Sequence, residues 1–263
     1  MTFAMRVAGV GVIGPGLADW ATTREILAGR TPYAFQPTVL PSPDVLPATE
    51  RRRAGRSVRL ALGAGLAAVR DAGCEARYLV SIFGSSGGDG DTLDAICDTL
   101  ASDDRELSPT RFHNSVHNAP AGYWGIATGA MHASDTIAAF DATFAASLVE
   151  ATARLATDPS QALLLVCYDA PYPEPLHAVR PILDAFGVGL VLTAGTAATG
   201  PRITVEISAR PAEPMDDAAL EAVRRAIPAA RSLPLLACIA RSEAGEASVE
   251  YLEGTSLRVR VLP

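Results

Sequence analysis

The 263-residue chain contains no lysine, so all 22 of its basic residues are arginine. A Walker-type phosphate loop and a Schiff-base nucleophile both require a lysine ammonium group, and neither is available here. The net charge is −7 at pH 7. Because a protein that binds nucleic acid generally needs a basic face to replace phosphate counterions, we do not expect that function.

Long apolar runs and paired cysteines are also missing. No run reaches the ~18 residues of a membrane-spanning helix, and no small-residue cleavage pattern of a signal peptide follows the N-terminal stretch. We therefore expect a cytoplasmic protein without a membrane span. The cysteines lie mostly inside apolar runs and form no CxxC pair and no dense disulfide framework, which predicts buried free thiols in a reducing cytoplasm. They are Cys74, Cys97, Cys167 and Cys238.

The chain does contain 49% hydrophobic residues, enough to bury the core of one large domain or of one domain with an appendage. Near-continuous apolar runs, which are typical of strands covered on both faces, alternate with helical patterns and predict an α/β layered fold. These runs are residues 6–14, 76–84, 162–168 and 185–195. A helical pattern between the first two ends at Gly73, a residue suited to a C-cap.

The last part of the chain has a different pattern. After residue 195 we expect short strands around one helix that begins near Asp216, and the segment LPLLACIA (233–240) is expected to be one of these strands. Residues 1–200 are therefore predicted to form the main domain. Residues 201–263 are predicted to form a small β/α extension packed on that domain.

Two motifs suggest ligands that the surrounding residues do not support. Gly9, Gly11 and Gly14 spell GxGxxG, but no helix opens inside the motif and no acidic residue ends a following strand, so close packing and a sharp exit are the expected roles. His113 and His117 have a spacing that would allow a metal on a helix. No nearby Cys, Asp or Glu completes a ligand set, so we expect no metal site and histidines hydrogen-bonded at a helix start.

A Gly/Ser/Asp loop at residues 85–91 follows the second apolar run. It lacks the lysine of a phosphate loop and the acidic periodicity of an EF-hand. We interpret it as a turn into a helix, with Asp89, Asp91 and Asp94 at the start of that helix, where carboxylates are favourable.

The segment 134–155 combines an apolar run ending at Asp141 with an Ala-rich helical pattern. This pattern predicts a strand, a tight elbow and a buried helix. A Cys or Ser at such an elbow lies on a helix N-terminus and becomes an activated nucleophile. The residue here is Phe144.

A basic run precedes the helix that ends at Gly73. It is either a solvated helix face or a docking surface for an acidic partner protein. The arginines are Arg51, Arg52, Arg53, Arg56 and Arg59.

Several segments, in this order, resemble the N-terminal half of the β-ketoacyl synthases. They are VAGVGVIGPG (7–16) followed by Trp20 and ILAGR (26–30), AAVRDAG (67–73), SPTRFHNSVHNAPAGYWGIATG (108–129), FDATFAASL (140–148) and AFGVGLVLTA (185–194). The resemblance implies one half of a thiolase fold, with a mixed, mostly parallel five-stranded sheet and helices on both faces. Phe144 then stands where these enzymes have the cysteine that attacks the acyl thioester.

The resemblance also implies that condensation chemistry is absent. Synthases of this family use two histidines in a second half of the chain, whereas the 71 residues after Leu192 (263 minus 192) contain none. The second half is expected to be missing or reduced to a remnant. A phenyl ring cannot form a thioester, so we expect no catalytic residues and no enzyme activity of the chain alone.

The sequence is especially similar to the short chain length factors of aryl polyene and xanthomonadin-type clusters. That similarity implies a subunit that pairs with a complete ketosynthase, shapes its acyl tunnel in fatty acid or polyketide-type polyene biosynthesis, and meets phosphopantetheine only on a partner acyl carrier protein. Its strand 134–140 would pair with the partner. The residues implied at the tunnel or interface are Phe112, Asn114, His117, Asn118, Trp124, Ile137, Phe140 and Phe144, and the arginine run from Arg51 to Arg59 is the candidate surface for the carrier protein.

Two other functions remain open. A free-standing acyltransferase or hydrolase would use Ser147 or a cysteine, although the sequence has no GxSxG elbow and Ser147 lies inside a helical pattern, where its hydroxyl is expected to bond to the backbone. A pure scaffold would bind the synthase without changing its product.

Overall fold

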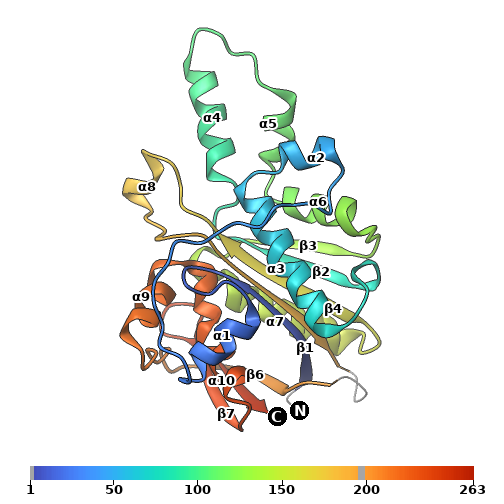
Figure 1. Ribbon diagram of the computed structural model, residues 1–263, viewed down its shortest axis with the longest axis vertical. Helices are drawn as coiled ribbons and strands as arrows, with labels where there is room; N and C mark the ends of the chain where they lie inside the picture. The colour runs from blue at the N-terminus through green and yellow to red at the C-terminus, as the bar shows by residue number, and fades with distance from the viewer. Residues whose placement is uncertain (1–2, 195–198) are drawn as a thin grey trace.

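The computed structural model describes residues 3–194 and 199–263. Residue 195, the predicted end of the run 185–195, lies outside them. The described residues form one eight-stranded sheet in the order β3-β2-β4-β5-β1-β6-β8-β7, with helices on both faces (Figure 1). The strands are β1 (Ala4–Ile13), β2 (Val80–Gly84), β3 (Ser134–Ile137), β4 (Ala162–Asp169), β5 (Phe186–Thr193), β6 (Arg202–Ser208), β7 (Gly245–Glu250) and β8 (Ser256–Leu262).

The helices connect these strands and cover them. The α-helices are α1 (Trp20–Leu27), α2 (Ala48–Arg53), α3 (Arg56–Ala72), α4 (Gly90–Ala101), α5 (Pro109–Asn114), α6 (Ala119–Thr128), α7 (Thr143–Thr157), α8 (Leu176–Val179), α9 (Ala218–Ala226) and α10 (Leu233–Arg241). Three short 3-10 helices are η1 (Ala76–Tyr78), η2 (Phe140–Ala142) and η3 (Pro228–Ser232). None of the helices in the described ranges is long and apolar enough to cross a membrane.

The directions of the strands correct the predicted sheet. Only the pairs β2–β3 and β2–β4 are parallel, and the other five neighbouring pairs are antiparallel. The expectation of a mostly parallel, five-stranded sheet was therefore wrong, while the α/β class was confirmed. Near-continuous apolar runs indicate that both faces of a strand are covered, and the central antiparallel strands β4, β5 and β1 meet that condition too.

The two faces of the sheet bury separate cores. Along β4, side chains alternate between faces, as the pleat requires. Leu163, Leu165 and Cys167 belong to the larger cluster, with residues of α7 and α10. Leu164 and Val166 belong to the second cluster, with residues of α3 and α6.

Glycines let α3 approach the sheet closely. A Cβ atom at Gly9 would lie 2.4 Å from the carbonyl oxygen of Ala68, and one at Gly11 would lie 2.2 Å from that of Ala64. Gly9 and Gly11 thus allow close helix packing, as expected. Gly73 ends α3 in the left-handed conformation, with φ 61°, which confirms the predicted C-cap.

The C-terminal part continues the same sheet through β6, β8 and β7. The segment 233–240, predicted as a strand, is instead the buried helix α10, so that prediction was wrong. A short apolar run fits either a buried strand or a buried helix, and Pro234 at the first turn is a helix-start signal that periodicity alone does not use.

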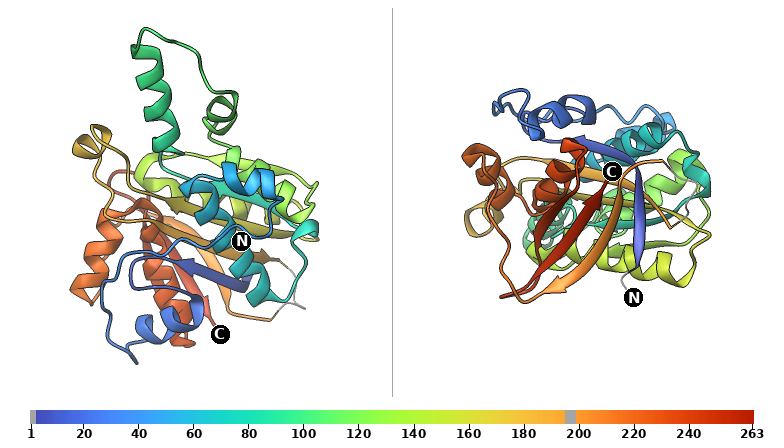
Figure 2. Two further views of the ribbon diagram at one scale, coloured as in Figure 1. Left: turned by 45° about the horizontal axis from the view of Figure 1, so that its top comes forward. Right: turned by 90° about the horizontal axis from the view of Figure 1, so that it is seen from below.

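The cysteines differ from one another in exposure. All four are free, as predicted, but only Cys167 and Cys238 are buried, and Cys74 and Cys97 are exposed. The expectation of buried thiols was therefore wrong for Cys74 and Cys97. Cys97 lies on α4, which Figures 1 and 2 show standing clear of the sheet together with α5.

Candidate functional site

The predicted elbow exists and is closed by its own side chain. β3 leads through η2 into α7, and Phe140 adopts φ 52°, a left-handed conformation that is unusual for a bulky residue. The Thr143 hydroxyl donates a hydrogen bond to the Phe140 carbonyl (2.7 Å) and accepts one from the Ala139 N–H (3.0 Å). These two bonds hold the sharp reversal between strand and helix.

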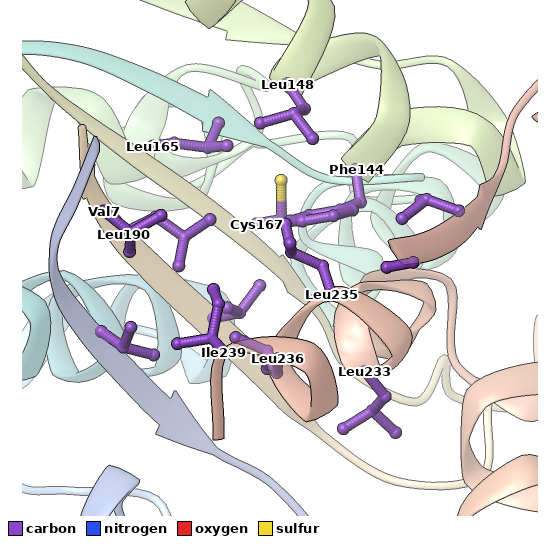
Figure 3. Close-up of a cluster of buried hydrophobic side chains, with 14 of the residues drawn as sticks. Val7, Phe144, Leu148, Leu165, Cys167, Leu190, Leu233, Leu235, Leu236 and Ile239 are labelled. Carbon is purple, nitrogen blue, oxygen red and sulfur yellow. The ribbon is translucent and has the colours of Figure 1, made fainter. Parts of the chain in front are cut away.

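Phe144 lies in the first turn of α7, with its side chain 0% exposed. Figure 3 shows its ring beside Cys167 of β4 and Leu235 of α10, within the larger core. The ring fills the position at the elbow where a nucleophile would be placed. Residues of α10 cover the ring, so the position at the elbow is closed to solvent.

The alternative nucleophiles are unfavourably placed. The Ser147 hydroxyl is fully buried and makes no hydrogen bond to the backbone, contrary to our expectation, but faces the Cys167 thiol. Burial raises the pKa of the Cys167 thiol to about 12, which suppresses the thiolate. Burial also raises the thiol pKa of Cys74 and Cys238.

Charged side chains bind the elbow to distant parts of the chain. Asp141 forms ion pairs with Arg180 (2.6 Å) and Arg231 (3.1 Å), and Arg231 also contacts Glu250 (3.2 Å). The Arg180 guanidinium lies 3.5 Å above the Phe140 ring. The elbow, the segment after α8, η3 and β7 are therefore held by one ionic network.

A second polar cluster lies where the parallel strands β2 and β4 end. Asp169 is buried, and its carboxylate accepts hydrogen bonds from the Ser86 N–H (2.8 Å) and hydroxyl (2.7 Å) and from the Ala229 N–H. Desolvation raises the pKa of Asp169 to about 6, although these bonds oppose the shift. The ring of His117 contacts the Ser85 carbonyl (3.0 Å). The cluster satisfies its own polar groups.

The two histidines considered for a metal do not share a helix, since His113 lies in α5 and His117 lies beyond its end. Within the ranges that the structure describes, no three His, Cys, Asp or Glu side chains are grouped to hold a metal ion. The loop 85–91 leads into α4 as expected, and the Asp89 side chain caps this helix by accepting from the Thr92 N–H (3.1 Å).

Six of the eight residues expected at a tunnel or interface separate into two groups, and His117 and Phe144 lie in the clusters described above. Phe112 and Phe140 are exposed (65% and 59%), Asn118 is exposed and Ile137 is half-buried in β3. Asn114 and Trp124 are buried instead: Asn114 bonds to the Arg53 carbonyl and the Tyr123 hydroxyl, and Trp124 packs on Phe83 with ring centroids 6.1 Å apart. In the chain alone, Asn114 attaches α5 to α2, and Trp124 packs α6 against β2.

Strand β3 is an outer strand of the sheet and hydrogen-bonds to β2 on one side only among the described residues. An open edge of this kind can accept a strand from another chain.

Most of the arginine run is occupied within the chain. Arg51 pairs with Asp44, Arg53 with Glu50, and Arg56 with Asp91 through two bonds of 2.6 and 2.5 Å. Arg59 donates to the carbonyls of Leu40 and Pro41. Among the described residues, Arg52 alone of the five has no such partner.

Sequence reasoning missed the polar residues of the elbow network and of the Asp169 cluster. Asp169 carried a usable signal, because an acidic residue that ends a buried strand points into the carboxyl edge of the sheet. Arg180, Arg231 and Glu250 carried none, since their sequence separation from Asp141 gives no indication of contact.

Comparison with known proteins gives the following matches. The family model described as β-ketoacyl synthase, N-terminal domain, matches residues 25–251. No curated protein matches the chain in a sequence search.

Solved structures are similar over nearly the whole chain. One is the ketosynthase ApeO in complex with its chain length factor ApeC from Xenorhabdus doucetiae (21% identity, TM-score 0.74, 99% of each chain covered). Another is the ishigamide ketosynthase/chain length factor (15%, TM-score 0.72, 98% of this chain and 99% of that chain). A third is AntDE:AntF, a type II acyl-carrier protein in complex with its ketosynthase (11%, TM-score 0.74, 100% and 99%). At these identities the likeness shows the fold, which is thiolase-like.

Proposed function

Because the chain belongs to the β-ketoacyl synthase family by its match to the N-terminal domain, we propose that it is a non-catalytic subunit that pairs with a complete ketosynthase. In this role it shapes the acyl tunnel of the synthase, in fatty acid or polyketide-type polyene biosynthesis. The chain itself uses no cofactor, and phosphopantetheine reaches the complex on an acyl carrier protein.

The observation that carries the proposal is Phe144. The elbow keeps the strand, turn and helix that would present a nucleophile, but a buried phenyl ring occupies the position. The neighbouring Ser147 and Cys167 are buried, and the raised pKa of Cys167 disfavours a thiolate. A family member with this elbow has an architecture suited to association rather than to acyl transfer.

The outer strand β3 and two exposed aromatic rings support pairing with a synthase. Phe140 follows β3, and Phe112 lies on α5, so both offer aromatic surface of the kind enriched in protein interfaces. The similar solved structures include a ketosynthase with its chain length factor and a ketosynthase with its acyl-carrier protein. We extend both associations to this chain.

The pairing is tested by producing the chain alone and together with each complete ketosynthase of the source genome. We expect co-elution with one synthase in size-exclusion chromatography and, with malonyl- and acyl-carrier proteins, a product whose length differs from that of the synthase alone. A monodisperse monomer that binds none of these synthases would contradict the proposal.

The role in chain length is tested separately from scaffolding. Phe112→Ala is expected to change the product length in a reconstituted assay read by mass spectrometry, because it removes aromatic volume from the surface assigned to the tunnel. Phe35→Ala, which truncates another exposed phenylalanine, is the matched control. Unchanged products with Phe112→Ala would favour the pure scaffold.

A further inference from the structure

The segment from α4 to α5, residues 90–114, forms an arm that stands clear of the sheet (Figures 1 and 2). The only buried residue of α4 is Gly90. An amphipathic helix gains little stability unless its apolar face is covered. The arm therefore presents a helix face that the described chain covers only in part.

The apolar face of α4 is continuous along the helix. Leu93, Ile96 and Leu100 follow a helical spacing, and Leu93 and Leu100 are 41% and 48% exposed. The exposed Phe112 and Val116 extend apolar surface into α5 and the turn after it. The arm thus joins the surface already assigned to the synthase.

The charge of the arm restricts what can cover it. Between residues 91 and 106 there are six acidic residues and one arginine, Arg105. Asp91 pairs with Arg56. The remaining five carboxylates have no ion-pair partner among the described residues, and they are Asp94, Asp98, Asp103, Asp104 and Glu106.

This arrangement is unfavourable in the free chain. Asp94 and Asp98 are four residues apart on one face of α4, where like charges repel. A basic surface would relieve the repulsion, whereas a second copy of this chain, with net charge −7 and the same arm, would add to it.

We propose that the arm docks onto a surface of the ketosynthase subunit that carries basic residues next to an apolar area. The acidic charge of the arm then favours the heterodimer over a homodimer. The inference rests on the proposed pairing and adds the contact that selects the partner. The carboxylates accelerate association through long-range attraction, and Leu93 and Leu100 slow dissociation through burial.

The test uses surface plasmon resonance with the full chain and the complete ketosynthase that co-elutes with it, at 50 and 300 mM NaCl. A charge variant carries Asp94→Asn, Asp98→Asn, Asp103→Asn and Asp104→Asn. We expect its association rate constant at 50 mM NaCl to fall about tenfold and to lose most of its salt dependence.

An apolar variant carries Leu93→Ser and Leu100→Ser, and its dissociation rate constant is expected to rise about tenfold. The matched control carries Glu243→Gln and Glu253→Gln, two exposed acidic residues next to β7, far from the arm in Figure 1, and should bind like the wild type. Circular dichroism melting establishes that each variant is folded.

The outcomes separate the two proposals. Arm variants that bind with wild-type rates overturn the docking element and leave the pairing intact. A wild-type chain that binds no synthase overturns both. Arm variants that change the mass of the chain alone in light scattering assign the arm to self-association and overturn the docking element.

Discussion

The elbow and the α4–α5 arm are opposite kinds of surface. At the elbow, Phe144 is fully buried, Thr143 closes the turn with two hydrogen bonds, and Asp141 is paired twice. On the arm, α4 buries no side chain, and five carboxylates lack ion-pair partners among the described residues. One region has its interactions satisfied internally, and the other does not.

This difference indicates where function is to be sought. A catalytic group must be reachable and in the correct protonation state, and the elbow provides neither. An interface needs exposed apolar area and unsatisfied charge, and the arm provides both. The elbow is therefore part of the hydrophobic core, whereas the exposed apolar area and the carboxylates without ion-pair partners lie on the arm.

The largest change in stability is expected for Phe144→Ala, which tests whether the elbow is part of the hydrophobic core. Because the ring is fully buried against Cys167 and Leu235, its removal leaves a cavity, and the free energy of unfolding should fall by about 4 kcal/mol. Urea denaturation followed by circular dichroism measures this. The control Phe112→Ala should change it by less than about 0.5 kcal/mol. Equal losses in the two variants would contradict the difference in burial between Phe144 and Phe112.

The next test concerns Asp169, near the elbow, whose pKa burial raises to about 6 from an ordinary value of 3.8. The folded state then binds the proton more tightly, so the contribution to stability is complete below about pH 4 and is lost as the pH rises through 6. Asp169→Asn should remove this loss, which amounts to about 3 kcal/mol over the whole range from below the pKa of the unfolded state to above pH 7.

The measurement for Asp169 is the difference in unfolding free energy between variant and wild type at several pH values. Glu243→Gln, which replaces an exposed carboxylate, is the control for the loss of one acidic side chain. A flat difference for Asp169→Asn would show that the buried group does not titrate between pH 4 and 7.

The ionic network predicts a smaller effect. Asp141→Asn keeps the size of the side chain but removes the charge that Arg180 and Arg231 share, and we expect a loss of about 2 kcal/mol, since the pair is partly buried. Asp216→Asn breaks a 3.7 Å contact with Arg241 at an exposed site and should cost less than about 0.5 kcal/mol. Equal losses in thermal or urea denaturation would mean that the network does not fix the elbow.

The sequence predicted features that depend on local patterns. The buried runs, the C-cap at Gly73 and the helix start at Asp89 follow from the spacing and chemistry of neighbouring residues. The direction of β5 and the helical state of 233–240 do not, because both depend on how an apolar segment packs in three dimensions.

The site was only partly predictable for the same reason. The elbow and its phenylalanine could be located from one continuous segment. The contact of Asp141 with Arg231 joins residues 90 positions apart, and the burial of Trp124 depends on its packing against β2. No local pattern encodes either contact.

The smallest change in stability is expected for substitutions on the α4–α5 arm. In the chain alone, Leu93→Ser with Leu100→Ser should change the free energy of unfolding by less than about 0.5 kcal/mol per residue, because both side chains are already partly in water, at 41% and 48% exposure. Leu148→Ala, a fully buried leucine of α7, is the control and should cost about 3 kcal/mol by urea denaturation. If the two arm substitutions cost as much as Leu148→Ala, the arm would already be covered in the free chain, its apolar face could not serve a partner, and the contrast with the elbow would fail.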